Sequence, residues 1–257
     1  MSKKILSSAL VLSPEITLFH TGPSFAHGPL PSVFYFALSG EDSLDTDPYN
    51  QFVQFLADYQ IRVFSLTLPG HEEGIPPSQA LDLWARDIRE GKDPFSPFFD
   101  KVEESFRYLV SQNIIEEDKV AVAGLSRGGF MAAHLAARIP AFKHILCFAP
   151  LLELNRVKEF HSLKDHPLVA NYHLDTVADK LCAHNIRIYI GNRDIRVGTK
   201  ASFELVEKLV DLAFEKKIRT APIELILTPS IGHQGHGTPP ETFKAGADWI
   251  IESLHVS

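Results

Sequence analysis

The stretch 119–140 places a serine, Ser126, where an apolar strand-like run changes into a helix-like run. Glycines lie two positions before it and two positions after it, at Gly124 and Gly128. This G-x-S-x-G pattern, between a strand and a helix, is typical of a nucleophile elbow, a tight turn that exposes a serine hydroxyl. The pattern predicts nucleophilic chemistry at Ser126. It also predicts that the Arg127 N–H, at the helix N-terminus, donates to a developing oxyanion.

A serine nucleophile needs a base that takes its proton and an acid that orients the base. In this arrangement the acid follows the serine along the chain and lies just beyond a later strand. Asp194 meets this requirement, because it follows the apolar run 186–191 in a Gly-Asn-x-Asp turn. Three other aspartates are alternatives, but none follows a clear strand: Asp165, Asp175 and Asp179. The sequence therefore favours Asp194 as the acid.

Two histidines, His233 and His236, lie in one loop between the last strand-like run and the last helix-like run. The distance from the preceding strand favours His233. The distance to the closing helix favours His236, and the glycines at 235 and 237 leave its ring unhindered on both sides. We predict His236 as the base and keep His233 as the alternative. The other histidine would line the pocket or support the loop.

Short apolar runs alternate with amphipathic runs along most of the chain. An opening hairpin is predicted over 5–12 and 15–20. Further strands are predicted at 32–40, 61–70, 119–124, 143–150, 186–191 and 222–228, and helices at 50–60, 98–113, 127–138, 200–217 and 240–254. Strands separated by helices predict an α/β fold whose central sheet is mostly parallel, with helices on both faces.

The length of 257 residues suits one α/β domain, and we predict a single domain over 1–257 whose first strands lie in 1–30. The sheet should have about eight strands, with no large cap or propeller domain. Two irregular segments, 71–97 and 151–185, leave the carboxyl ends of strands, where open α/β sheets bind ligands. We predict that these two segments form pocket walls.

The composition is that of an ordinary globular protein, with 45% hydrophobic and 22% charged residues. A net charge of −7 and scattered basic residues argue against a nucleic-acid partner. No run approaches the ~18 apolar residues that span a bilayer. The run 1–15 lacks a small-x-small cleavage site and predicts a strand rather than a signal peptide. With two cysteines and no metal-ligand spacing, we expect a cytoplasmic protein that uses no metal or other cofactor.

From about residue 30 onward, the chain resembles the serine hydrolases of the α/β-hydrolase superfamily. The run 84–110 followed by the sequence AGLSRGGFMAAHLAA is similar, more narrowly, to the prolyl-oligopeptidase-like and dienelactone-hydrolase-like branch. The Ser-Arg-Gly-Gly form of the elbow is the specific part of this resemblance. It implies Ser126 as nucleophile, Asp194 as acid and one of the two loop histidines as base. True dienelactone hydrolases use a cysteine nucleophile, which argues against their substrate here.

The sequence departs from this family after the third strand, where many relatives carry His-Gly and the second oxyanion donor. Here Ser39-Gly40 stands in that place. Since a backbone N–H does not depend on the missing histidine, we predict the Glu41 N–H as the second donor. The Glu41 carboxylate must then turn away from the oxyanion.

The function predicted from these residues is hydrolysis of an ester, thioester or amide through an acyl-enzyme. A carboxylesterase acting on small acyl substrates fits best, because a small domain without a propeller readily handles small acyl groups. A peptidase of the prolyl-oligopeptidase type is the alternative within enzymes. A non-catalytic binding member of the fold is the alternative from another class.

Overall fold

The computed structural model describes residues 6–256, so Ile5, at which the predicted first strand begins, lies outside the described residues. One sheet with the order β1-β2-β4-β3-β5-β6-β7-β8 forms the centre of the fold. Its strands are β1 (Ser8–Ser13), β2 (Ile16–Thr21), β3 (Leu30–Phe36), β4 (Arg62–Ser65), β5 (Ile115–Leu125), β6 (Phe142–Phe148), β7 (Asn185–Gly191) and β8 (Ile223–Thr228). The β1–β2 and β2–β4 pairs are antiparallel and the other five pairs are parallel, which confirms the predicted hairpin and mostly parallel sheet.

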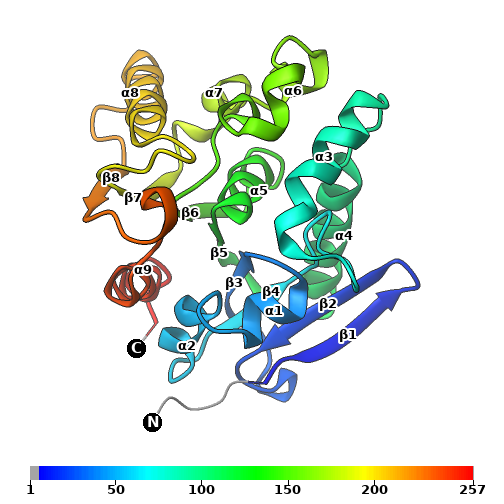
Figure 1. Ribbon diagram of the computed structural model, residues 1–257. Coiled ribbons are helices and arrows are strands. Elements are labelled where there is room, and N and C mark those ends of the chain that lie inside the picture. Colours follow the sequence, from blue (N-terminus) through cyan, green and yellow to red (C-terminus); the bar gives the residue numbers. More distant parts are fainter. Residues whose placement is uncertain (1–5, 257) are drawn as a thin grey trace.

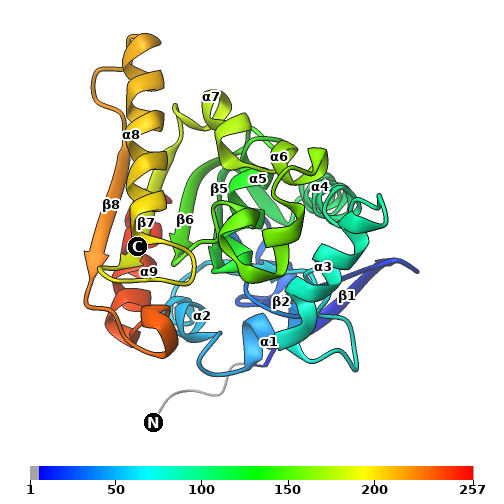
Figure 2. The same ribbon diagram turned by 45° about the horizontal axis from the view of Figure 1, so that its top comes forward.

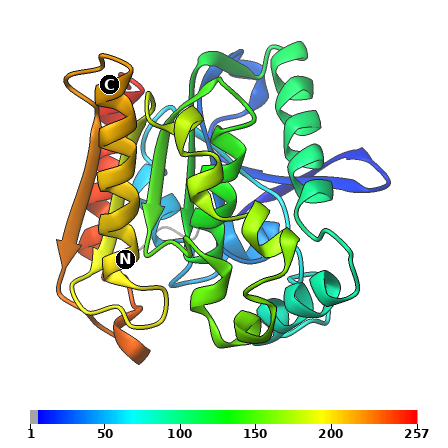
Figure 3. The same cartoon turned by 90° about the horizontal axis from the view of Figure 1, so that it is seen from above.

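Helices cover both faces of this sheet (Figure 1; Figure 3). They are α1 (Gly40–Asp45), α2 (Gln51–Leu56), α3 (Ala80–Arg89), α4 (Ser96–Ser111), α5 (Arg127–Ala136), α6 (Pro167–Asn171), α7 (Ala178–Leu181), α8 (Thr199–Glu215) and α9 (Pro240–Ser253). In β5, Val120 and Val122 point into the core under α3, α4, α5 and α8. Ala121 and Ala123 point into the core under α1, α2 and α9. This alternation places both faces of β5 in apolar surroundings, as expected for a central parallel strand.

The chain departs from the predicted elements at several places; for example, the strand predicted over 61–70 ends at Ser65, and the irregular segment 151–185 contains α6 and α7. The strand predicted over 32–40 ends at Phe36, because Ser39 caps α1: its Oγ accepts a hydrogen bond from Asp42 N at 3.0 Å. The predicted irregular segment 71–97 contains α3, whose apolar residues face the core and bury Trp84 completely. Within residues 6–256 there is no propeller, and every helix is too short or too polar to cross a bilayer.

Tyr172 connects the two long segments on the α5 side of the sheet, where α6 lies beside α5 and α4 (Figure 2). Its hydroxyl donates to Asp93 Oδ2 at 2.6 Å and lies 3.0 Å from Ser96 Oγ. Its carbonyl oxygen lies 3.2 Å from His134 Nε2 in α5. The segment 151–185 is therefore fastened both to the start of α4 and to the helix that follows Ser126.

His134 should make the stability of this packing depend on pH. The residue is 5% exposed, its ring lies among Phe99, Phe130 and Tyr172, and burial lowers its pKa from 6.5 to about 4. At pH values between these two pKa values, this histidine therefore binds a proton in the unfolded chain but stays neutral in the folded chain. The free energy of unfolding should fall as the pH falls from about 6.5 to about 4, by an amount on the order of 3 kcal/mol from this residue.

The His134→Phe variant tests this prediction by urea unfolding at several pH values between 7 and 4. Its loss of stability on acidification should be smaller than that of the wild type. His27→Phe, which replaces an exposed ring, is the matched control and should retain the wild-type slope. Equal slopes for His134→Phe and the wild type would contradict the prediction.

Candidate active site

Ser126 lies at the turn between β5 and α5 with φ of 54° and ψ of −110°, a conformation that a residue with a side chain rarely adopts. Contacts with the end of β6 hold this turn in place. Ser126 N donates to Phe148 O at 2.8 Å, and Leu151 N donates to Ser126 O at 3.0 Å. The turn directs the serine side chain into a pocket above the carboxyl edge of the sheet, as the elbow pattern predicts.

The two glycines of the pattern are required by close backbone contacts. A Cβ atom at Gly128 would lie 1.8 Å from Phe36 O in β3, and one at Gly124 would lie 2.1 Å from the carbonyl carbon of Gly128. Neither distance is compatible with van der Waals contact. The glycines thus let α5 approach β3 and β5 closely enough to form the turn at Ser126.

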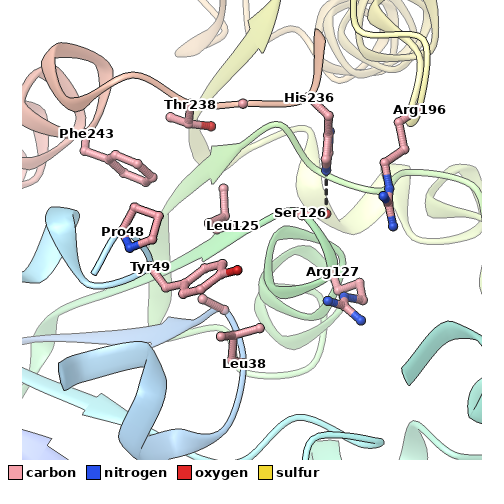
Figure 4. Close-up of a pocket in the computed structure, with 12 residues that line it drawn as sticks. Leu38, Pro48, Tyr49, Leu125, Ser126, Arg127, Arg196, His236, Thr238 and Phe243 are labelled. Carbon is pink, nitrogen blue, oxygen red and sulfur yellow. Dashed lines mark hydrogen bonds between the residues drawn. The ribbon is translucent and has the colours of Figure 1, made fainter. Parts of the chain in front are cut away.

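His236 lies beside Ser126, with its Nε2 atom 2.8 Å from Ser126 Oγ (Figure 4). Its other ring nitrogen, Nδ1, lies 2.7 Å from Asp194 Oδ2. Because a carboxylate only accepts hydrogen bonds, Nδ1 carries the ring hydrogen and donates a hydrogen bond to Asp194, which leaves Nε2 free to accept a hydrogen bond from the serine hydroxyl. The structure thus joins Ser126, His236 and Asp194 in one chain of hydrogen bonds.

The Asp194 carboxylate is completely buried and held by the turn that follows β7. Its second oxygen, Oδ1, accepts hydrogen bonds from Arg196 N at 2.9 Å and Val197 N at 3.0 Å. Ile195 N donates to Gln234 O at 3.0 Å, which fastens this turn to the histidine loop. These contacts fix the position of the carboxylate and, through it, the orientation of the His236 ring.

His233 lies in the same loop but points elsewhere. It begins a single 3-10 turn, His233–Gly235, is exposed, and lines a cavity next to the Ser126 pocket. The loop reverses direction between the two histidines, because Gln234 and Gly235 both have positive φ. A β-bridge between Ile231 and Gly237 closes the reversal. Of the two candidate bases, only His236 is brought to Ser126.

The first residue of α5, Arg127, carries an N–H without an acceptor inside its own helix, as the first residues of every helix do. This N–H follows Ser126 directly, where the elbow pattern predicts an oxyanion donor. Glu41 lies exposed in the first turn of α1. The pocket borders Ala37 and Leu38 rather than Glu41, and the Leu38 N–H donates to Ser43 Oγ at 2.9 Å. The Glu41 N–H as second donor stays a prediction.

The pocket at Ser126 has a volume of about 270 Å³. Its wall includes Pro48, Tyr49 and Phe243, which sequence reasoning missed because they come from the α1–α2 connection and α9 (Figure 4).

No residue of 71–97 or 151–185 lines this pocket; both segments line the adjacent cavity instead. Four phenylalanines at or near the two segments are buried in the core instead: Phe95, Phe98, Phe99 and Phe160. Within residues 6–256, no group of histidine, cysteine and carboxylate side chains is arranged to hold a metal ion.

Comparison with solved structures relates this fold to peptidases and to an esterase. TT1662 from Thermus thermophilus superposes with a TM-score of 0.71 at 16% identity, over 98% of both chains. A cold-adapted esterase from an Arctic intertidal metagenomic library superposes with a TM-score of 0.65 at 18% identity, over 96% of this chain and 92% of the esterase. Prolyl oligopeptidase B from Galerina marginata gives a TM-score of 0.70 at 17% identity, over 99% of this chain.

The present chain spans 37% of the Galerina peptidase and 35% of a putative dipeptidyl aminopeptidase IV from Bacteroides ovatus. No curated protein matches the sequence. At these low identities the structural matches show the α/β-hydrolase fold alone. The family is shown by a match to the sequence. The profile of the prolyl oligopeptidase family matches residues 91–256, the part that carries Ser126, Asp194 and His236. The chain therefore belongs to the prolyl oligopeptidase family, a group of serine hydrolases, and the predicted resemblance is confirmed.

Proposed function

We propose that this protein is a carboxylic ester hydrolase in which Ser126 is the nucleophile, His236 the general base and Asp194 the orienting acid. The observation that carries the proposal is the unbroken chain of hydrogen bonds from Ser126 Oγ to His236 Nε2, at 2.8 Å, and from His236 Nδ1 to Asp194 Oδ2, at 2.7 Å. Such a chain activates a hydroxyl that is otherwise a weak nucleophile.

The reaction has two steps, formation of the acyl-enzyme and its hydrolysis. His236 takes the hydroxyl proton of Ser126 while Oγ bonds to the ester carbonyl carbon, and the resulting oxyanion receives a hydrogen bond from the Arg127 N–H. The imidazolium then gives its proton to the departing alkoxide, which leaves as the alcohol. Asp194 stabilises the imidazolium but takes no proton itself. Removing one oxyanion donor from a comparable protease costs about 3 kcal/mol of transition-state stabilisation.

Water completes the cycle. His236 takes a proton from a water molecule, whose oxygen bonds to the acyl carbon of the acyl-enzyme. The second tetrahedral intermediate collapses, the carboxylic acid leaves, and the imidazolium returns its proton to Ser126 Oγ. Every group that moves a proton in these steps belongs to the chain, so the proposal needs no cofactor.

A pocket of about 270 Å³ favours small acyl substrates. The wall formed by Leu38, Tyr49 and Phe243 offers an apolar surface to an acyl or alkyl group. Peptidases occur among the structural relatives, so the choice between ester and amide rests on this pocket and on a direct comparison of substrates.

Labelling with a fluorophosphonate tests the proposal without knowledge of the substrate. We expect the probe to attach to the wild type at Ser126, identified by mass spectrometry, and to leave the folded Ser126→Ala variant unlabelled. The wild type should also cleave 4-nitrophenyl butyrate faster than the matched 4-nitroanilide. A folded wild type that is neither labelled nor active would contradict catalysis, and faster anilide cleavage would favour a peptidase.

A further inference from the structure

A second cavity, of about 590 Å³, adjoins the Ser126 pocket. The two spaces share three wall residues: Tyr49, Arg127 and Arg196. Figure 4 shows Arg127 and Arg196 on one side of the Ser126–His236 pair, whereas Pro48, Tyr49 and Phe243 lie on the other. A molecule bound across Ser126 would thus meet an apolar wall at one end and two guanidinium groups at the other.

The cations of this second cavity, which we call the basic cavity, are not balanced by carboxylates. Among residues 6–256, neither Arg127 nor Arg196 nor Lys158 has an ion-pair partner. Arg156 is the exception, because it pairs with Glu153 and Glu204. One carboxylate, that of Glu159, lines the cavity. Three unpaired cations therefore face a single carboxylate in a protein whose net charge is −7.

The Arg127 side chain is held in position by one of its N–H groups. Its Nη1 donates to Pro77 O at 2.8 Å, and its remaining N–H groups find no acceptor among residues 6–256. Burial and the nearby charge of Arg196 lower the pKa of Arg127 to about 10, so the group remains charged at neutral pH. A guanidinium that is partly buried, still charged and beside a like charge gains from an anion that replaces its lost hydration.

We propose that the substrate of this site carries a carboxylate, which Arg127 and Arg196 bind on the side of Ser126 opposite the apolar wall. The inference rests on the proposed ester hydrolysis and adds the charge of the substrate to it. A guanidinium offers two parallel N–H groups that match a carboxylate, so the pair binds the anion and also fixes the ester carbonyl relative to Ser126. The substrate class is a small ester with an apolar end and an anionic end.

The carboxylate can belong to the acyl half or to the leaving alcohol, and two substrates distinguish these cases. Monobenzyl succinate carries it in the acyl half, whereas the 3-phenylpropanoyl ester of glycolic acid carries it in the alcohol half. The methyl ester of each free carboxylate is the matched neutral substrate. The readout is the ratio of kcat/KM for the anionic substrate to that for its neutral partner, measured in each variant.

We expect this ratio to exceed about 10 for one of the two pairs in the wild type, and to fall at least about tenfold in Arg196→Gln and in Arg127→Gln. Arg193→Gln removes the same charge from the same turn but does not line the basic cavity, so it should retain the wild-type ratio. Added salt should lower the wild-type ratio. A merely structural role for Arg127 would lower both rates and leave the ratio intact.

Two results separate this inference from the proposed function. An enzyme that is labelled at Ser126 but has a ratio near 1 for both pairs would overturn the inference and leave ester hydrolysis standing. If hydrolysis itself fails, calorimetry with the Ser126→Ala protein decides. One of the anionic compounds should then bind more tightly than its methyl ester, and Arg196→Gln in the same background should remove the difference. Equal binding of acid and methyl ester for both compounds would overturn the inference.

Discussion

Replacing His236 with alanine is expected to lower kcat for ester hydrolysis by a factor of about 10⁵, because the triad histidine of a comparable protease carries an effect of this size or larger. Without the ring, nothing at 2.8 Å from Ser126 Oγ can take the hydroxyl proton. Steady-state kinetics with 4-nitrophenyl butyrate and fluorophosphonate labelling should both show the loss. The variant should remain folded, which circular dichroism checks, with a lower melting temperature because the buried Asp194 carboxylate loses its hydrogen bond from the ring.

His233→Ala is the matched control for this variant, because it removes the same ring from the same loop. It should lower kcat by less than about tenfold, since His233 makes no hydrogen bond with Ser126 and general-base catalysis would remain intact. A large loss in His233→Ala together with a small loss in His236→Ala would exchange the two assignments and contradict the geometry described above.

Gly128→Ala is expected to destabilise the fold and to abolish labelling of Ser126. The added methyl group would lie 1.8 Å from Phe36 O, so α5 must move away from β3. Overpacking of this kind typically costs up to about 3 kcal/mol, and here the movement displaces the helix that begins next to the nucleophile. Urea unfolding measures the first effect and fluorophosphonate labelling the second.

Gly91→Ala provides the control for this substitution. Gly91 has φ of 75° and open space around its Cα, so the added methyl group meets no atom. It should cost roughly 1–2 kcal/mol for the left-handed backbone alone and leave labelling intact. If Gly128→Ala were no less stable than Gly91→Ala and were still labelled, the close approach of α5 to β3 would not be required for the elbow.

The parts of the site that the sequence predicts are those defined over short stretches. The elbow at Ser126 needs only a strand, a small residue on each side and a helix, all within about a dozen residues. Asp194 follows its strand just as directly. The alternation of apolar and amphipathic runs predicts the parallel sheet for the same reason, since each strand or helix carries its own periodicity.

The parts that the sequence could not predict depend on contacts between distant segments. The choice between His233 and His236 depends on a loop reversal at Gln234 and Gly235, and on the hydrogen bond from Ile195 N to Gln234 O. A count of residues from the strand or from the helix reveals neither the loop reversal nor this hydrogen bond. Tyr49 enters the pocket from the connection between α1 and α2, about 80 positions before the serine, and no local pattern marks it.

The sequence does not mark Arg196, and here the reason is different. Two residues after the acid, its side chain resembles that of any exposed arginine in a turn, and only its position beside Arg127 in the wall of both cavities distinguishes it.

The long segments 71–97 and 151–185 also contribute more residues to the core than their irregular sequence suggests. Trp84, Phe95 and Phe160 are each at most 1% exposed.

At Ser126, the backbone conformation that presents the nucleophile lowers the stability of the fold. With φ of 54° and ψ of −110°, it holds a conformation that costs a residue with a side chain on the order of 1–3 kcal/mol. Glycine would accept this conformation with less strain but offers no nucleophile. Selection for thermal stability alone would therefore reward loss of the reactive side chain, so a programme that evolves this protein toward higher temperature has to select for turnover at every round.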